Sequence, residues 1–231
     1  MMIIIFCRMA SISDGGRQGL YYVHHFLEWF SMPWPRQHKT ETRARIVAAA
    51  AAAMREHGPD GISVAEVMKL AGLTHGGFYA HFGSKDELLT DAFERANEES
   101  MAPLAKSASG SSDVDQLRAV IDAYLSPWHL AHVDLGCPVA AIAPEVARSG
   151  GRLQRHMSRA IHARIDWLRT LLSGRAKSEA RSDDAVGALA AMVGGLVLAR
   201  ALGGNDGRNV LAATRRFLDR SLPSRTRANQ D

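Results

Sequence analysis

The chain of 231 residues has only two cysteines, Cys7 and Cys137, which are too few for a framework of disulfide bonds. Small secreted domains that depend on disulfides use many more, so the composition favours a reducing, cytoplasmic setting. There is no uninterrupted apolar run of about 20 residues, the length that crosses a bilayer, and no membrane partner is expected. A glycine-rich phosphate loop of the GxGxxG or Walker type is also missing, so no nucleotide cofactor is predicted.

Charges of both signs are present, with 28 Lys and Arg residues, 24 Asp and Glu residues and a formal net charge of +4. A modest positive charge is compatible with a nucleic-acid partner but does not identify one. No stretch alternates convincingly between apolar and polar residues as a β-strand does, whereas helical spacing recurs along the chain. The sequence therefore predicts an all-α fold.

Residues 63–82 predict two short helices joined by a tight turn. Ser63 and Glu66 have the spacing of a capping box, in which each side chain bonds the backbone N–H of the other residue. Gly72 is expected to end the first helix with a positive φ, and Thr74 to cap the second. A helix, a short turn containing glycine and a second helix make a helix-turn-helix motif, which places its second helix in a DNA groove.

The second of these helices has an aromatic side and a side of very small residues. Phe78 and Phe82 fall about 40° apart at the helical period, so both are expected in the core. The opposite side carries Gly76 and Gly77, each of which costs about 0.8–1.0 kcal/mol in a helix relative to alanine. A helix that brings its backbone close to a phosphate or a base edge has a reason to carry that cost. The alternative is an N-terminal turn that never becomes fully helical.

Helices are also expected on both sides of this motif. Downstream, Ser84 and Glu87 are predicted to form a second capping box that opens a long helix. Lys85 adds a cation to the first turn of that helix, where free N–H groups and the helix dipole suit a phosphate. Upstream, residues 40–54 predict a first helix, which Gly58 ends.

The stretch from about Thr40 to Asn97 resembles the DNA-binding domain of TetR-family transcriptional repressors. Residues 71–85, AGLTHGGFYAHFGSK, match that family's signature almost position by position. The resemblance implies an N-terminal three-helix helix-turn-helix domain that binds double-stranded DNA. The residues expected at the DNA are Thr42, Arg43, Ser63, Thr74, His75, Gly76, Gly77, Tyr79, His81 and Lys85.

The resemblance also implies a role for several of these side chains. Tyr79 and His81 would contact DNA from the recognition helix, Thr74 and Lys85 would hold phosphates, and Thr42 or Arg43 would clamp one from the first helix. Two alternatives remain open, in which the Tyr79 ring packs internally and His81 is an ordinary surface histidine.

The recognition helix has no Arg, Asn or Gln, the residues that read guanine or adenine with two hydrogen bonds. Base readout is therefore expected to depend on Tyr79, His75, close backbone approach and DNA shape.

Beyond residue 98 the pattern predicts a second helical domain for ligand binding and dimerisation. A loop is expected at residues 106–113, followed by helices at 113–130, 138–148, 152–173, 182–203 and 206–221. The helix from Ser182 to Leu202 is apolar nearly all round, so it must be buried, and a chain of this size could bury it alone. The resemblance implies instead a homodimer built on the last long helices, with 152–173 and 182–203 as the candidates. Two recognition helices about 34–36 Å apart would read a palindrome.

Cys137 precedes Pro138, which suits the first position of a helix, so the thiol is expected at a helix N-terminus. Thiols at such positions can be reactive, and some members of the family that this chain resembles sense oxidants or electrophiles through a cysteine. The alternative is a buried cysteine that acts as a small apolar residue. His129, His132 and Asp134 lie near Cys137, but their spacing matches no recurrent zinc pattern, and no metal is predicted.

The sequence thus divides into four expected segments. Residues 1–37 are an N-terminal extension, either disordered or an artefact of an upstream start codon with Met32 as the true start, or else an arm that docks on DNA or on the body. Residues 38–98 are the DNA-binding domain, residues 99–222 the regulatory and dimerisation domain, and residues 223–231 a flexible tail.

The predicted function is that of a dimeric, cytoplasmic transcriptional repressor. It would leave a palindromic operator when an unknown small-molecule inducer binds the C-terminal domain, or when Cys137 is modified. No catalytic residues are predicted, and the chain is not expected to be an enzyme. Two rival functions are an all-α enzyme with Cys137 as nucleophile, and a ligand-buffering protein that has lost DNA binding. The intact run 74–85 argues against the second.

Overall fold

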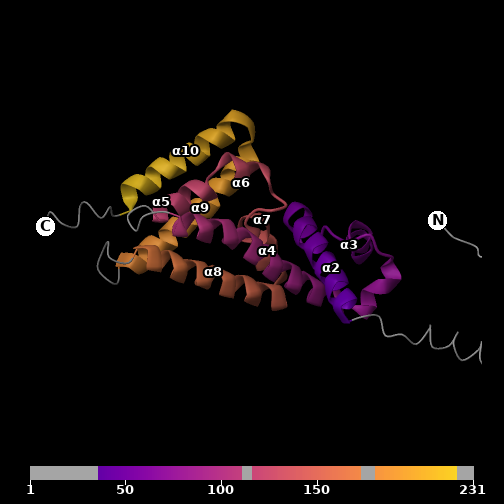
Figure 1. Ribbon diagram of the computed structural model, residues 1–231. Coiled ribbons are helices and arrows are strands. Elements are labelled where there is room, and N and C mark those ends of the chain that lie inside the picture. Colours follow the sequence, from indigo (N-terminus) through magenta and orange to yellow (C-terminus); the bar gives the residue numbers. More distant parts are fainter. Residues whose placement is uncertain (1–35, 111–115, 173–179, 223–231) are drawn as a thin grey trace, which may run out of the picture. The chain divides into compact units, whose positions relative to one another are not determined.

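The computed structural model describes residues 36–110, 116–172 and 180–222, and these residues form helices, turns and loops but no β-strand (Figure 1). The expected all-α fold is confirmed. The chain divides into two units between Thr40 and Glu41, and the architecture below concerns the described residues from Glu41 onward. The expectations for an N-terminal extension and a C-terminal tail fall almost wholly outside the described residues.

Four helices make up the N-terminal part of the fold. They are α2 (Arg36–His57), α3 (Val64–Leu70), the 3₁₀ helix η1 (His75–Ala80) and α4 (Lys85–Ser109). Gly58 and Gly72 follow α2 and α3 with φ of 76° and 71°, as expected of glycines that end helices. Their shared core contains Met54 and Phe93, both fully buried.

The described residues of the C-terminal part form six helices. They are α5 (Gln116–Tyr124), α6 (Pro127–Ala131), α7 (Pro138–Ser149), α8 (Gly151–Leu172), α9 (Ala180–Leu202) and α10 (Gly204–Ser221). The single helix expected at 113–130 is wrong, because α5 and α6 are separate. Pro127 has no N–H to continue α5, and the Ser126 hydroxyl accepts a hydrogen bond from the His129 N–H to start α6 instead.

The loop expected at residues 106–113 is also partly wrong, because α4 continues to Ser109. The hydroxyls of Ser107 and Ser109 donate hydrogen bonds back to the carbonyls of Pro103 and Lys106, so they bond within the helix. Ala108 is buried in the same turn. Tertiary packing therefore extends a segment whose composition is typical of a loop. As a result, α4 runs without a break across the expected domain boundary between residues 98 and 99.

Two hydrophobic cores lie in the molecule, and α7 contributes to both. Cys137, which caps α7, and Val139 in its first turn pack in the core formed by α5, α8, α9 and α10. Ile142 and Val146, further along α7, pack in the core of the N-terminal helices. A helix of 12 residues therefore joins the two cores.

Helix α9 is less enclosed than its composition predicts. Ala188 and Leu196 are buried, but Val197, Leu198 and Leu202 are 41%, 58% and 60% exposed. By length and composition alone, Ser182–Leu202 could cross a membrane, although buried helices pass the same test and 39% of this segment is buried. The expectation of a wholly buried helix is wrong for one chain, since one apolar side of α9 faces outward.

Candidate DNA-binding surface

The capping box at the start of α3 forms as expected. The Ser63 N–H donates to the Glu66 carboxylate at 2.8 Å, and the Glu66 N–H donates to the Ser63 hydroxyl at 3.2 Å. Hydrogen bonding of the Glu66 carboxylate by the side chain and the backbone N–H of Ser63 lowers the pKa of Glu66. Ser63 therefore sets where α3 begins, whether or not it also contacts DNA.

The expected recognition helix differs from an α-helix. Residues 75–80 form a 3₁₀ helix, in which the Gly77 N–H donates to the Thr74 carbonyl at 3.1 Å. Thr74 occupies the capping position, but its side chain makes no capping hydrogen bond. Adjacent glycines have low helix propensity, so residues 75–80 form a short 3₁₀ helix and not a longer α-helix. Of the two alternatives, the structure supports the segment that does not become fully α-helical.

Two phenylalanines hold this segment against the core. Phe78 and Phe82 are each 2% exposed, and their rings stack with centroids 5.6 Å apart. Tyr79 lies on the opposite side and is 74% exposed, with its ring edge-on to Phe78 at 5.2 Å. The alternative of an internally packed Tyr79 is therefore wrong. His75 is also exposed, whereas His81 is half-buried.

The two glycines at the start of η1 are not required by the protein's own packing. A Cβ atom added at Gly76 would meet no atom within 4 Å, and one at Gly77 would lie 3.5 Å from the Met68 methyl group. Neither residue has a positive φ, in contrast to Gly72. An alanine would fit at both positions, so the absence of side chains leaves the backbone open to a partner.

The second expected capping box, at the start of α4, is only half formed. The Ser84 hydroxyl accepts from the Glu87 N–H at 3.1 Å, but the Glu87 carboxylate accepts from the Gly83 N–H at 2.8 Å and not from Ser84. The other carboxylate oxygen of Glu87 is held by Arg43 at 3.2 Å, which directs the group toward Gly83. Lys85 lies in the first turn of α4, half-buried.

Arg43 has an internal role that sequence reasoning missed. Its guanidinium lies 3.2 Å from Glu87 and 2.6 Å from Asp91, and 4.5 Å from the centroid of the Phe82 ring. These contacts tie α2 to α4 and support the recognition segment from behind. Thr42 is only 7% exposed. Thr42 and Arg43 are therefore less available to a phosphate than the other expected contacts.

Arg45 is a further candidate that was not expected. Its side chain is exposed and donates to the Ala71 carbonyl at 3.3 Å, at the turn between α3 and η1. A cation at this helix end complements the helix dipole and adds positive charge beside the turn. No local pattern reveals this contact, because the two residues lie 26 positions apart.

Comparison with known proteins agrees with this geometry. The model of the family described as bacterial regulatory proteins, tetR family, matches residues 46–92, which contain the whole helix-turn-helix. The structure also resembles a TetR transcriptional regulator from Chloroflexus aurantiacus, with a TM-score of 0.71 and 27% identity, over 81% of this chain and 99% of that one. Residues 46–92 therefore match the tetR family, and the fold of most of the chain is similar to that of a TetR regulator.

Curated proteins similar to this chain are also regulators. An uncharacterized HTH-type transcriptional regulator of Mycobacterium tuberculosis is 31% identical over 104 residues, 45% of this chain. The HTH-type transcriptional regulator TtgR of Pseudomonas putida is 33% identical over 82 residues, 36% of this chain and 39% of its own length. The match spans about half, 52%, of the Mycobacterium protein. Both relatives are described as transcriptional regulators.

In the C-terminal part of the fold, Cys137 is 1% exposed and caps α7. Its N–H donates to Nε2 of His129 at 2.9 Å, and Nδ1 of His129 lies 2.7 Å from the Tyr124 carbonyl. Nε2 therefore accepts and Nδ1 donates, which requires the neutral ring. Burial lowers the pKa of His129 to about 4. Because both ring nitrogens are engaged, His129 is not free to bind a metal with Cys137. In the described ranges, no group of three or more His, Cys, Asp or Glu residues could hold a metal ion.

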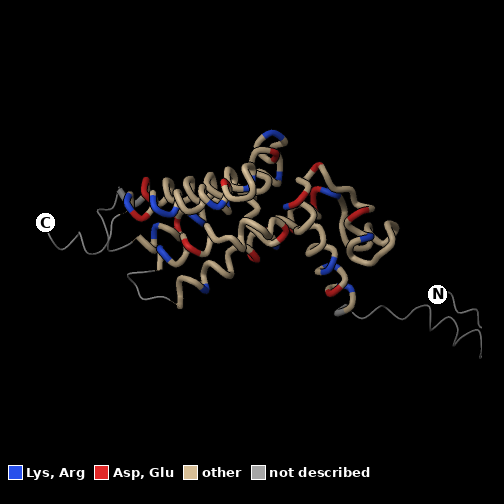
Figure 2. Tube along the Cα trace, turned by 90° about the horizontal axis from the view of Figure 1, so that it is seen from above, with Lys and Arg blue, Asp and Glu red and all other residues tan. Residues whose placement is uncertain are grey.

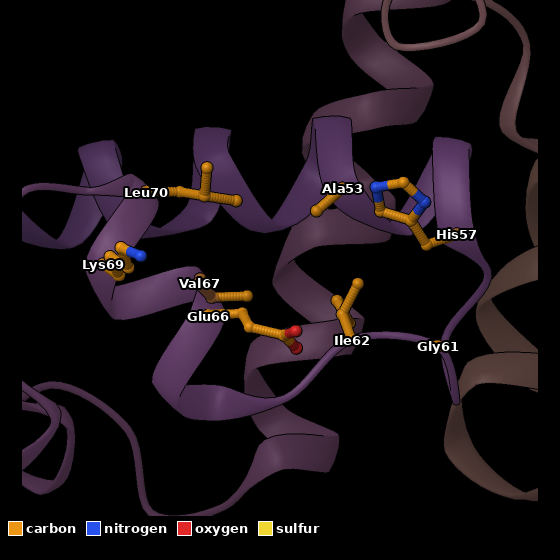
Figure 3. A pocket seen from close by; sticks show the side chains of 8 residues that line it. All are labelled: Ala53, His57, Gly61, Ile62, Glu66, Val67, Lys69 and Leu70. Atoms are coloured by element: carbon orange, nitrogen blue, oxygen red, sulfur yellow. The ribbon is translucent and has the colours of Figure 1, made fainter.

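The charge distribution and the pocket in this region add little to the candidate DNA-binding surface. Figure 2 shows Lys and Arg interspersed with Asp and Glu along the helices. A pocket of about 520 Å³ lies between the end of α2 and α3, with Ile62 and Val67 inside and the exposed Leu70 at its edge (Figure 3). All its lining residues lie between Ala53 and Leu70, so it is not an inducer pocket in the C-terminal domain.

Proposed function

We propose that the protein is a cytoplasmic, dimeric transcriptional repressor of the TetR type, which binds a palindromic operator and is released by a small-molecule inducer. The observation that carries the proposal is the recognition segment, which presents Tyr79, 74% exposed, and two open glycines on a rigid core. This arrangement lets the backbone of η1 approach DNA closely, with Tyr79 and His75 as the exposed side chains. DNA shape supplies the remaining specificity, since no Arg, Asn or Gln lies on the segment.

The outward side of α9 and α10 supports a dimer. Leu198 of α9 and Phe217 of α10 are 58% and 53% exposed and lie beside a groove of about 400 Å³. A Cβ atom at Gly195 would lie 2.7 Å from the Thr214 hydroxyl, so this glycine lets α10 approach α9. A Cβ atom at Gly194 would meet nothing within 4 Å, which leaves room for a partner helix. Exposed apolar surface of this kind marks protein interfaces.

This surface changes the expected pair of dimerisation helices. Helix α8 was the expected partner of α9, but its apolar residues Leu153, Met157 and Leu168 are buried within the chain. The unpaired apolar side runs from α9 onto α10 instead. We therefore assign the dimer contact to α9 and α10.

The proposed mechanism couples an inducer in the C-terminal domain to the recognition segments through α7, which joins the two cores. An inducer that prefers one arrangement of α7 changes the spacing of the two recognition segments. Linkage then requires DNA to weaken inducer binding by the same factor. Modification of Cys137 is a second proposed trigger, but a thiol that is 1% exposed must first become accessible. If Cys137→Ser leaves oxidant-induced DNA release unchanged, this trigger is excluded.

The test is a footprint of the full chain on DNA upstream of its own and neighbouring genes, over a salt series. A protected palindrome with affinity that falls as salt rises is the expected result. Lys85→Gln should reduce the salt slope of the dimer by about 2, about 1 for each protomer, if Lys85 holds a phosphate. Lys106→Gln, in the last turn of the same helix, is the matched control and should leave the slope unchanged. Weak binding without sequence preference would overturn the proposed function.

A further inference from the structure

Two arginines in the C-terminal part of the fold, Arg164, which is buried, and Arg200, which is half-buried, have no carboxylate partner among the described residues. Arg164 of α8 is 4% exposed, and it donates only to the Ser100 hydroxyl at 3.1 Å and the Ala160 carbonyl at 3.5 Å. Arg200 of α9 donates to the His129 carbonyl at 2.9 Å, while its buried Nε finds no acceptor. The contrast is Arg55, 3% exposed, which pairs with Glu99 at 2.8 Å.

The groups around these arginines carry no compensating negative charge. Tyr124 is fully enclosed, and its hydroxyl has no hydrogen-bond partner of acceptable geometry in the described part of the chain. Burial and the adjacent Cys137 thiol raise the pKa of Tyr124 well above its ordinary value, whereas Arg164 and Arg200 lower it less. The phenol is therefore neutral, and both guanidinium groups interact with it electrostatically. His129 is neutral as well.

The N-terminus of α7 lies beside the cluster formed by Tyr124, His129 and Arg200. Cys137 caps this helix of 12 residues without a side-chain hydrogen bond, so the positive end of the helix dipole is not offset by a carboxylate. Arg200 reaches the cluster over Gly136, where an added Cβ atom would come within 2.7 Å of its guanidinium nitrogen. Gly136 therefore makes room for the cation.

Buried charges in proteins are paired, because an isolated ion loses its hydration without replacement. Here a buried guanidinium, Arg164, and a half-buried one, Arg200, both act electrostatically on the Tyr124 hydroxyl, and the described residues supply no anion. A carboxylate satisfies the planar donors of arginine with two hydrogen bonds. The surroundings are otherwise apolar, with Ile121, Leu125 and Met192 in the same core.

We propose that the inducer is an organic acid with an apolar body, and that Arg164, Arg200 and the Tyr124 hydroxyl bind its carboxylate. The inference rests on the proposed function for the existence of an inducer. A carboxylate bound by these residues would lie at the start of α7. Because later residues of α7 pack in the N-terminal core, the bound acid would act directly on the helix that joins the two cores.

The first test measures the thermal unfolding of the full chain with matched acid and amide pairs: benzoate and benzamide, phenylacetate and phenylacetamide, octanoate and octanamide. At least one acid should raise Tm by about 3 °C or more, its amide should not, and Arg164→Met should abolish the rise. Arg159→Met, an exposed arginine on the same helix, should retain it. Equal shifts with the amides, shifts that survive Arg164→Met, or no shift with any acid would overturn the proposal.

The second test requires no ligand. Cys137→Asp places a carboxylate in the cluster, and Cys137→Asn is its uncharged control with equal capping ability. The aspartate variant should have a higher Tm than the asparagine variant, and Arg164→Met should reverse that order, because the buried carboxylate then loses a partner. An aspartate variant that melts below the asparagine variant in the presence of both arginines would contradict an anion site. Neither test involves DNA, so a failed footprint together with a positive acid response would reject the proposed function but not the site.

Discussion

The carboxylate of Glu145 on α7 lies directly against the backbone of Gly58, the residue that ends α2. A Cβ atom added at Gly58 would come within 2.0 Å of one carboxylate oxygen. Gly58 also has a φ of 76°, which few residues other than glycine adopt. The contact joins α7, which follows Cys137, to the end of α2 in the DNA-binding part. It is therefore one physical link between the proposed inducer site and the proposed DNA-binding surface.

Gly58→Ala should therefore destabilise the protein for two reasons. The positive φ costs about 1–2 kcal/mol for a residue with a side chain, and the new methyl group must also displace Glu145. Gly151→Ala is the matched control, because Gly151 has a φ of 78° but no atom within 4 Å of an added Cβ. Chemical denaturation should show a larger loss of unfolding free energy for Gly58→Ala than for Gly151→Ala.

The contribution of Glu145 can be isolated by a double variant. Glu145→Ala should remove most of the excess destabilisation of Gly58→Ala and leave only the cost of the positive φ. If Gly58→Ala and Gly151→Ala lose the same free energy, the contact with Glu145 has no energetic weight and α7 is not coupled to α2 at this point.

Gly76→Ala should separate folding from DNA binding. An added methyl group meets no atom of the protein, and alanine has the higher helix propensity, so Tm should be unchanged or slightly raised. The same methyl group would hold the backbone away from DNA, and operator affinity should fall about tenfold or more, equivalent to about 1.4 kcal/mol. Fluorescence anisotropy with operator DNA, beside a melting curve, measures both. Unchanged affinity would mean that η1 does not approach DNA through this glycine.

The parts of the DNA-binding motif that could be predicted are those with local causes. The Ser63–Glu66 capping box, the positive φ of Gly72 and the burial of Phe78 and Phe82 all follow from residues within a few positions of one another. The backbone of η1 was harder to predict, because its 3₁₀ form reflects weak propensity in competition with packing. Residue types alone do not decide that competition.

Contacts between distant parts of the chain could not be predicted. Arg43 was expected at a phosphate, but it pairs with Glu87, 44 positions away. Arg164 contacts Ser100 across 64 positions, and Arg200 contacts His129 across 71. Charge and helical period show only that these arginines occur on helices. Whether an arginine is buried and what it meets depends on how the helices pack, which a single sequence does not display.

Leu198→Asp should convert the dimer to a monomer. Leu198 is 58% exposed and borders the groove between α9 and α10, so a charge there would be buried unpaired in the interface. Leu70→Asp is the matched control, since Leu70 is 67% exposed on α3, away from this surface. Sedimentation velocity should give a monomer for Leu198→Asp and a dimer for Leu70→Asp. A dimer that survives Leu198→Asp would place the interface elsewhere.

Protonation of His129 should make the fold sensitive to mild acid. Burial lowers its pKa from 6.5 to about 4, so between these values the unfolded chain binds a proton that the folded chain does not. The stabilising contribution is complete above pH 6.5, and it decreases as pH falls toward 4. A shift of this size corresponds to about 3 kcal/mol. His129→Gln, which can still accept from the Cys137 N–H and donate to the Tyr124 carbonyl, should flatten the dependence of unfolding free energy on pH in this window. His162→Gln, an exposed histidine on α8, should leave it unchanged. An equal pH slope in both variants would show that the neutral ring of His129 does not control stability in mild acid.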